Sequence, residues 1–191
     1  MKKYNSKLAA VDIAEIALFA ALMVAGAYIQ IPIPFMPLTF QTVLSVLAGL
    51  MLGWKKGMLS MLAYALLGLF GLPVFTAGGG FFYVIKPSFG YILGFIASAG
   101  VAGIAYDRPK KLWLIIILAL SATVADYLFG VLYFIAVWEI SGYSNLWGAV
   151  VTYNLIYLPK DVILSVLAAF LSRAVTPAIV KMHAKVKRSG N

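Results

Sequence analysis

An adjacent pair of opposite charges, Lys160 and Asp161, lies in an otherwise uncharged stretch of the sequence. An ionisable side chain inside an apolar span is costly unless it is paired or hydrated. Neighbours on a regular helix diverge by about 100°, which predicts a poor mutual salt bridge and a shared polar cavity instead. Pro159 is expected to bend the helix toward this cavity, and Asn154 to share its face. We therefore predict a ligand site, with a structural charge cluster near the membrane surface as the alternative.

A glycine-rich stretch is the second candidate for ligand binding. Gly78, Gly79 and Gly80 allow the backbone to approach a ligand closely, and Lys86 follows them. The sequence has no GxxxxGK[ST] motif, so a nucleotide-binding P-loop is not expected. The favoured interpretation is a lid over a small molecule, and the alternative is a flexible linker.

Other polar residues have more than one interpretation. Gln41 and Thr42 follow a proline-rich loop, where they suit either ligand binding or capping of a helix. Asp126 lies in the middle of an apolar segment and requires a polar neighbour or a proton, so its role stays open. Asp12 and Glu15 are expected to pair with lysines near the positive end of a helix.

The residue types that most catalytic sites need are missing. The chain has no cysteine, and its single histidine, His183, lies in a basic tail where we expect it to be solvated. Neither a metal site nor serine–histidine catalysis is expected. We therefore predict no catalytic residue, no metal and no cofactor, and a membrane-embedded enzyme is the least favoured function.

Composition indicates the elements that position these residues. Hydrophobic residues make up 63% of the 191 residues and charged residues 11%, against ~45–50% and ~25% in soluble domains. The prediction is an all-α polytopic membrane protein with one domain over residues 1–191. Prolines and glycines divide it into six transmembrane helices, at about 12–30, 38–54, 58–72, 88–106, 112–137 and 149–175. Cleavage of the first helix as a signal peptide is not expected, because further spans follow it.

Charge distribution predicts the orientation. Six spans place both termini on one side, together with the short turns at 55–57 and 107–111. Thirteen of the 15 lysines and arginines fall on that side, so both termini are predicted to be cytoplasmic in the cell membrane. Headgroup contacts explain the net charge of +9 without nucleic acid as a partner. Lys86 and Lys160 are the two exceptions, which marks both as functional candidates.

Small residues repeat along the first helix. Ala17, Ala21 and Ala25 recur every four residues and flatten one helix face. Such a face allows close helix packing, either with a partner protein or within the bundle. Alanine is common in membrane helices, so the pattern leaves both interpretations open.

Several short strings, taken in order, resemble a known family. They are Ile31-Pro32-Ile33-Pro34-Phe35, Gly68-Leu69-Phe70-Gly71-Leu72-Pro73-Val74-Phe75, Gly78-Gly79-Gly80, Gly90-Tyr91 and Leu158-Pro159 with Asp161. With this spacing the chain resembles the BioY family, most of all its lactococcal members. The BioY proteins are the biotin-binding S components of energy-coupling factor (ECF) vitamin transporters. Lys160 stands where the family usually has glycine, and Leu164 where it usually has lysine, so the positive charge of the site is expected at a shifted position.

The resemblance implies a fold, a function and partners. The fold would be that of ECF S components. The chain would bind biotin near its outer face and dock through the first helix, with Ala17, Ala21 and Ala25, to an EcfT-type coupling protein driven by two ATPase subunits.

The resemblance also implies roles for site residues. Asp161 would accept a ureido N–H of biotin, with Asn154 and Lys160 near the ureido carbonyl. Lys86 or Tyr91 would meet the carboxylate. Phe75, Tyr83 and Val74 would wall the ligand, the loop with Gly79 and Gly80 would cover it, and Gln41 could form a hydrogen bond to it. The alternatives are an S component for another vitamin, such as thiamin or riboflavin, and a solitary small-molecule carrier.

Overall fold

Helices make up every regular element in the part of the chain that the structure describes. The computed structural model describes residues 9–106 and 111–189, with side chains described up to residue 182. The elements in chain order are α1 (Ala10–Tyr28), α2 (Gln41–Leu52), α3 (Trp54–Leu69), η1 (Phe81–Ile85), α4 (Phe89–Gly103), α5 (Leu112–Ile140), α6 (Leu146–Tyr153), η2 (Leu155–Tyr157) and α7 (Leu158–Ser189). The expected turn at 107–111 lies outside the described residues except for Lys111, as does the side chain of His183.

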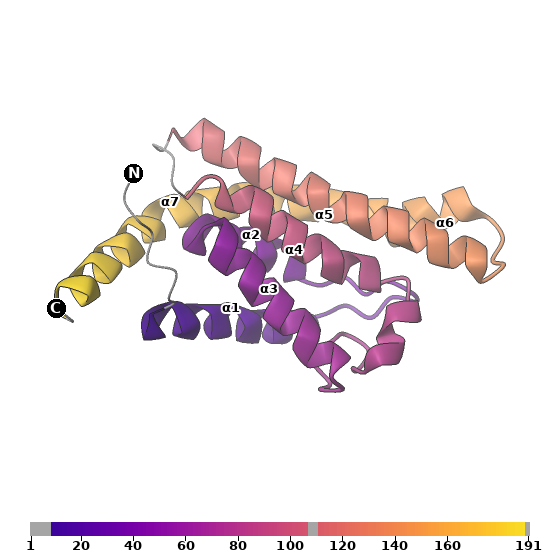
Figure 1. Cartoon of the computed structure of the whole chain (residues 1–191). Helices are drawn as coiled ribbons and strands as arrows, with labels where there is room; N and C mark the ends of the chain where they lie inside the picture. The colour runs from indigo at the N-terminus through magenta and orange to yellow at the C-terminus, as the bar shows by residue number, and fades with distance from the viewer. Residues whose placement is uncertain (1–8, 107–110, 190–191) are drawn as a thin grey trace.

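The helices form one elongated bundle whose two ends differ (Figure 1). The start of α1, the α2–α3 junction and the end of α7 lie at the left end of the view. The connections 29–40, 70–88 and 141–145 lie toward the right end. These connections are thus at the opposite end from the basic helix ends.

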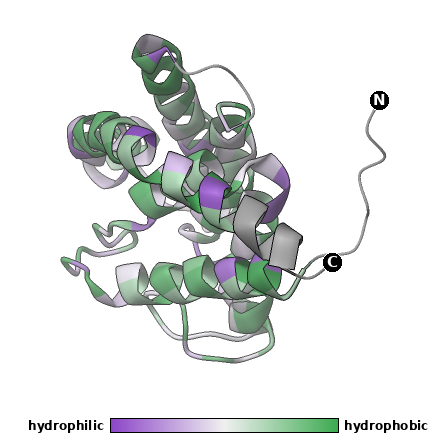
Figure 2. Cartoon of the chain, turned by 90° about the vertical axis from the view of Figure 1, so that its left-hand side faces the viewer, coloured by the Kyte–Doolittle hydropathy of each residue, from purple (hydrophilic) through white to green (hydrophobic). Residues whose placement is uncertain are grey.

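The apolar helices agree with a polytopic membrane protein. α1, α5 and the run Leu146–Met182 are each long and apolar enough to cross a bilayer, and α2 and α4 are shorter apolar helices. Figure 2 shows hydrophobic residues along much of the length of the helices, including faces directed away from the bundle. Lipid tails solvate such faces favourably, whereas exposing them to water would be costly.

The α2–α3 junction is tighter than expected. Only Gly53, with φ of 82°, separates the two helices. This left-handed conformation is accessible to glycine, so one residue can reverse the chain. Lys55 and Lys56 therefore lie in the first turn of α3, and the prediction of a separate basic turn at 55–57 was wrong.

The sixth expected helix is interrupted. It consists of α6, the short η2 and α7, and the break begins at Asn154 rather than at a bend after Pro159. Pro159 is the second residue of α7, a position at which proline needs no helical N–H partner. The predicted bend at Pro159 is therefore replaced by a new helix start, and the charged pair falls in the first turn of α7.

An ion-pair cluster links the beginnings of α1 and α3, as predicted for the acidic residues. Lys56 Nζ lies 3.0 Å from Asp12 Oδ1 and 2.7 Å from Glu15 Oε2. Burial lowers the pKa of Lys56, but its hydrogen bonds and charge attraction to Glu15 and Asp12 outweigh burial and raise that pKa above its ordinary value. This cluster holds one end of α1 against α3.

Candidate functional site

A cavity with about 560 Å³ of empty space, its open mouth included, lies among the connections and helix ends. Its apolar lining comes from Met36, Pro37, Leu38, Phe75, Ile92 and Phe95. Its polar lining comes from Thr39, Gln41, Thr42, Tyr64, Thr76, Tyr83, Ser88, Tyr91, Tyr127, Tyr157, Lys160 and Asp161. The mixture suits a partly apolar ligand with several hydrogen-bonding groups.

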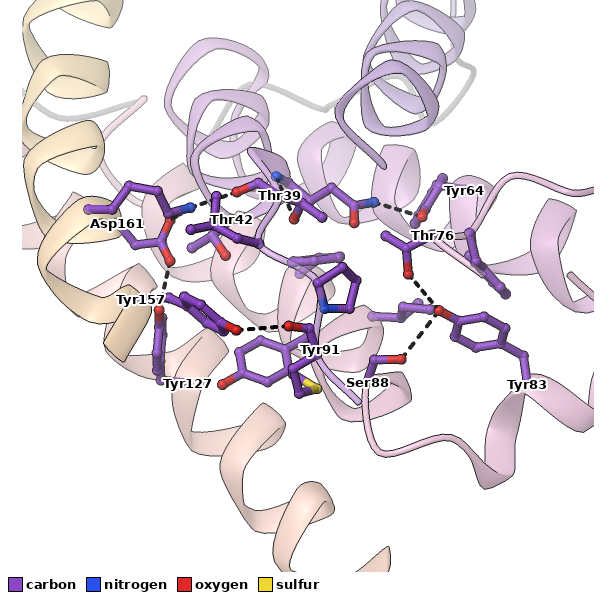
Figure 3. A pocket seen from close by; sticks show the side chains of 18 residues that line it. Thr39, Thr42, Tyr64, Thr76, Tyr83, Ser88, Tyr91, Tyr127, Tyr157 and Asp161 are labelled. Atoms are coloured by element: carbon purple, nitrogen blue, oxygen red, sulfur yellow. Dashed lines mark hydrogen bonds and ion pairs between the residues drawn. The ribbon is translucent and has the colours of Figure 1, made fainter. Parts of the chain in front are cut away.

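The Lys160–Asp161 pair forms one end of the cavity. Lys160 Nζ lies 2.7 Å from Asp161 Oδ1 and donates to the Thr39 carbonyl at 2.6 Å. The prediction of a poor mutual salt bridge was therefore wrong, because the flexible lysine side chain brings its ammonium to the neighbouring carboxylate despite the angle between the two positions. Tyr127 donates to Asp161 Oδ2 at 2.7 Å (Figure 3). Asp161 Oδ1 is engaged by the Lys160 ammonium and accepts no other hydrogen bond from the described residues, so a ligand N–H could use its remaining lone pair.

Asn154 supports this end of the cavity without lining it. Its Oδ1 accepts a hydrogen bond of 3.0 Å from the Tyr91 hydroxyl, and Tyr91 lines the cavity. Asn154 is fully buried, and its Nδ2 has no hydrogen-bond partner among the described residues. Asn154 therefore orients Tyr91, and both N–H groups of its Nδ2 remain without a partner among the described residues.

Three hydroxyl groups gather at the other side of the cavity, away from Asp161 (Figure 3). The Tyr83 hydroxyl lies 2.9 Å from Thr76 Oγ1 and accepts a hydrogen bond of 3.2 Å from Ser88. Phe75 packs against Tyr83, with ring centroids 4.5 Å apart. The cavity thus has two polar ends with apolar walls between them.

Hydrogen bonds tie α1 to the connection 70–80 beside the cavity. Gln41 Nε2 donates to the Met23 carbonyl in α1 at 3.2 Å and to the Tyr64 hydroxyl at 2.7 Å. Tyr64 in turn donates to the Val74 carbonyl at 3.2 Å. At the end of α1, Tyr28 donates to the Pro73 carbonyl and Gln30 to the Thr76 carbonyl. Helix α1 and one wall of the cavity are therefore directly connected.

Besides Asn154, the cavity lining also excludes Val74 and three further predicted ligand residues, Lys86, Gly79 and Gly80. Lys86 Nζ donates to the Ala77 carbonyl at 3.2 Å and lies 5.0 Å from the Tyr83 ring centroid. Gly79 packs so closely that an added Cβ would lie 2.0 Å from the Leu72 carbonyl oxygen. Gly80 has φ of 105°, a conformation that favours glycine. Both glycines shape the connection, and neither contacts the cavity.

Asp126 is buried next to the cavity lining. Thr42 Oγ1 donates to Asp126 Oδ2 at 2.8 Å, which supplies the polar neighbour that its position requires. Its Oδ1 has no hydrogen-bond partner among the described residues and lies against Gly94. Asp126 thus links α5 to α2 and α4, and the absence of a side chain at Gly94 makes the room for it.

Gly94→Ala is therefore expected to destabilise the protein by about 1–3 kcal/mol through overpacking. An added Cβ would lie 2.3 Å from Asp126 Oδ1 and 2.7 Å from the Asp126 carbonyl oxygen, and the carbonyl belongs to a helix that cannot yield easily. Thermal unfolding in detergent measures the loss. Gly100→Ala in the same helix is the control, because its nearest neighbour would be the flexible Met58 Sδ at 3.1 Å. Equal melting temperatures for the two variants would contradict the expected overpacking at Gly94.

The alanines of α1 lie on its exposed face. Ala17, Ala21 and Ala25 are exposed, whereas Phe19 and Met23 on the other face are buried. Packing within this chain therefore does not account for the alanine spacing.

Comparisons with known proteins agree with this architecture. The sequence profile of the BioY family matches residues 1–181. The chain belongs to the BioY family. Among relatives, the putative biotin transporter BioYB of Bacillus subtilis is 35% identical over 188 residues, which cover 92% of each chain. The probable biotin transporter BioY of Lysinibacillus sphaericus is 49% identical over 111 residues.

The extent of these matches differs between relatives. The Lysinibacillus match covers 58% of this chain and only 55% of that relative. A crystal structure of the S component for biotin from an ECF-type ABC transporter superposes with a TM-score of 0.74, at 24% identity, over 86% of this chain and 90% of that one. The chain therefore has the ECF S-component fold, as the sequence resemblance implied.

The sequence analysis of this BioY-family chain predicted some of the residues that line the cavity. Of the predicted ligand residues, the cavity lining includes Asp161, Lys160, Tyr91, Phe75, Tyr83 and Gln41. The tyrosines Tyr64, Tyr127 and Tyr157 also line it and were not predicted. Their signal was available, because a tyrosine hydroxyl in the middle of an apolar span needs a partner and marks a polar interior.

Proposed function

We propose that this BioY-family chain is the biotin-binding membrane subunit of an ECF-type uptake system. The observation that carries the proposal is the cavity with two polar ends, one of which holds the Lys160–Asp161 pair. Biotin has a ureido ring at one end, a carboxylate at the other and an apolar thioether ring between them. Its chemical layout matches the order of the groups around the cavity.

The Asp161 end suits the ureido ring. Asp161 Oδ1, which already pairs with Lys160 Nζ, has a second lone pair that can accept one ureido N–H, and the same ammonium lies beside it to donate to the ureido carbonyl. The Tyr127 hydroxyl holds the other oxygen of Asp161 in place. In this assignment Lys160 supplies the positive charge of the site from the first turn of α7.

The hydroxyl end suits the carboxylate. Thr76, Tyr83 and Ser88 offer O–H donors at that end, whereas the Lys86 ammonium is engaged by the Ala77 carbonyl. A carboxylate accepts several hydrogen bonds, and neutral donors can bind it without a second buried cation. We assign the carboxylate to this hydroxyl cluster, with Lys86 outside it.

Docking and orientation complete the proposal. The exposed face with Ala17, Ala21 and Ala25 would meet an EcfT-type coupling protein, which two ATPase subunits drive. The sequence contains no P-loop of its own, which fits a partner that hydrolyses ATP. Both termini would be cytoplasmic, and the cavity would open toward the outside.

Mass spectrometry of the ligand that copurifies with the protein tests the substrate. Biotin released from protein purified from biotin-containing medium is the expected result, and purification from biotin-free medium is the control. Recovery of thiamin or riboflavin would replace biotin by another vitamin on the same fold. Uptake by liposomes that contain this chain alone would instead support a solitary carrier.

A further inference from the structure

The most exposed aromatic and aliphatic side chains gather at the loop-bearing end of the bundle. Phe70, Phe81, Phe82 and Ile85 are 85%, 74%, 82% and 70% exposed. They come from the end of α3 and from η1, the short helix that covers one side of the cavity. We call these four residues the lid face. A soluble protein would not expose so many large apolar groups within one connection.

η1 has two faces with different environments. Tyr83 is buried, lines the cavity and packs on Phe75, whereas Phe81, Phe82 and Ile85 point away from the protein. The backbone of η1 is fixed on the inside by the hydrogen bond from the Tyr133 hydroxyl to the Val84 carbonyl. The outward direction of the lid face is therefore built into the fold.

Charge argues for lipid as the occupant of this face. Lys86 is the only charged residue between positions 57 and 106, and its ammonium is turned back to the Ala77 carbonyl and the Tyr83 ring. A protein partner with polar or charged groups would find no complementary charge on the lid face. Aromatic side chains next to a lysine are typical of the boundary between headgroups and acyl chains.

Backbone geometry limits how deeply the connection 70–80 can enter the bilayer. Residues 70–80 are irregular, and several of their backbone groups lack helical partners. Irregular backbone exposed to lipid is excluded from the hydrocarbon core. The lid face is also continuous with the lipid-facing sides of α3, where Leu62, Leu66 and Leu67 are exposed.

We propose that the lid face inserts into the headgroup–acyl boundary of the bilayer and anchors the cavity wall there. The apolar side chains would dip below the headgroups, while the irregular connection stays at their level. One face of η1 then contacts lipid and the other, through Tyr83, contacts the ligand cavity. This assignment concerns the lipid contact alone and does not depend on which ligand binds.

Spin labelling tests the insertion. Because the chain has no cysteine, Phe82→Cys introduces a single thiol for a nitroxide label. The labelled full chain is reconstituted into vesicles of equimolar phosphatidylcholine and phosphatidylglycerol. Collision rates with oxygen, which concentrates in lipid, and with a water-soluble nickel chelate are then measured. The expected oxygen-to-nickel ratio is several-fold higher than for Ser144→Cys, an exposed position in the polar α5–α6 turn.

Two further results complete the test. Ile85→Cys is the second variant and is also expected to give a high ratio, because the Ile85 side chain is 70% exposed on η1. A ratio equal to that of Ser144→Cys at both positions would place the lid face in water and overturn the proposal. A label shielded from both reagents would also overturn it, because a second protein chain would then cover the face.

Discussion

Asp161→Asn is expected to weaken biotin binding by well over tenfold. The carboxylate is buried, accepts from Tyr127 and pairs with Lys160, and its Oδ1 is the acceptor assigned to a ureido N–H. Asparagine would offer an amide in place of a charged acceptor and leave the Lys160 ammonium without its counter-charge. Loss of one partner of a buried charged hydrogen bond costs on the order of 2–5 kcal/mol, and about 1.4 kcal/mol changes affinity tenfold. Isothermal titration calorimetry in detergent measures the change.

The matched control for this substitution is Asp12→Asn. Asp12 also pairs with a lysine, but it lies at the start of α1, near the other end of the bundle. Its replacement should leave biotin affinity unchanged. If the Asp161→Asn protein melted at the temperature of the unsubstituted protein and bound biotin equally well, the assignment of Asp161 to the biotin site would be wrong.

Ala21→Trp is expected to preserve biotin binding and abolish ATP-driven uptake. Ala21 lies on the exposed face of α1, so a large ring there meets no side chain of this chain's interior. The same ring would prevent close approach of a partner helix, because such contacts need small residues. Titration of the purified subunit and uptake of labelled biotin by cells that express the complete system measure the two effects.

Val124→Trp separates docking from a general effect of a large exposed side chain. Val124 is 63% exposed on α5, outside the alanine face. Uptake should continue with this variant. If the Ala21→Trp variant also supported normal uptake, α1 would not be the docking helix.

The sequence was sufficient for an all-helical polytopic architecture but not for two junctions. Gly53 allows a reversal within one residue, and its neighbours Lys55 and Lys56 looked like a turn because charges usually lie outside helices. The break before α7 was assigned to Pro159, since proline commonly bends a helix. The structure breaks at Asn154 instead, and such a choice between neighbouring positions depends on tertiary contacts that the sequence does not display.

Charged residues in apolar segments predicted some of the cavity-lining residues correctly and others wrongly. Lys160 and Asp161 line the cavity, where their position in an apolar segment had placed them. Lys86 was singled out by the same argument, yet its flexible side chain turns to the Ala77 carbonyl. Tyr127 and Tyr64 carry no charge at neutral pH and were missed, although their hydroxyls organise the polar ends.

The ties between α1 and the cavity wall have a thermodynamic consequence. Tyr28, Gln30 and Gln41 join α1 and its C-terminal extension to the segment beside the ligand, so the two cannot shift independently. A partner that binds α1 therefore favours one conformation of the cavity wall over another. Linkage is reciprocal, so a ligand that favours one arrangement changes the affinity of α1 for that partner by the same factor. Ligand-free and ligand-bound subunits would then differ in affinity for the same partner. Bound ligand would thus change how well a subunit competes for that partner.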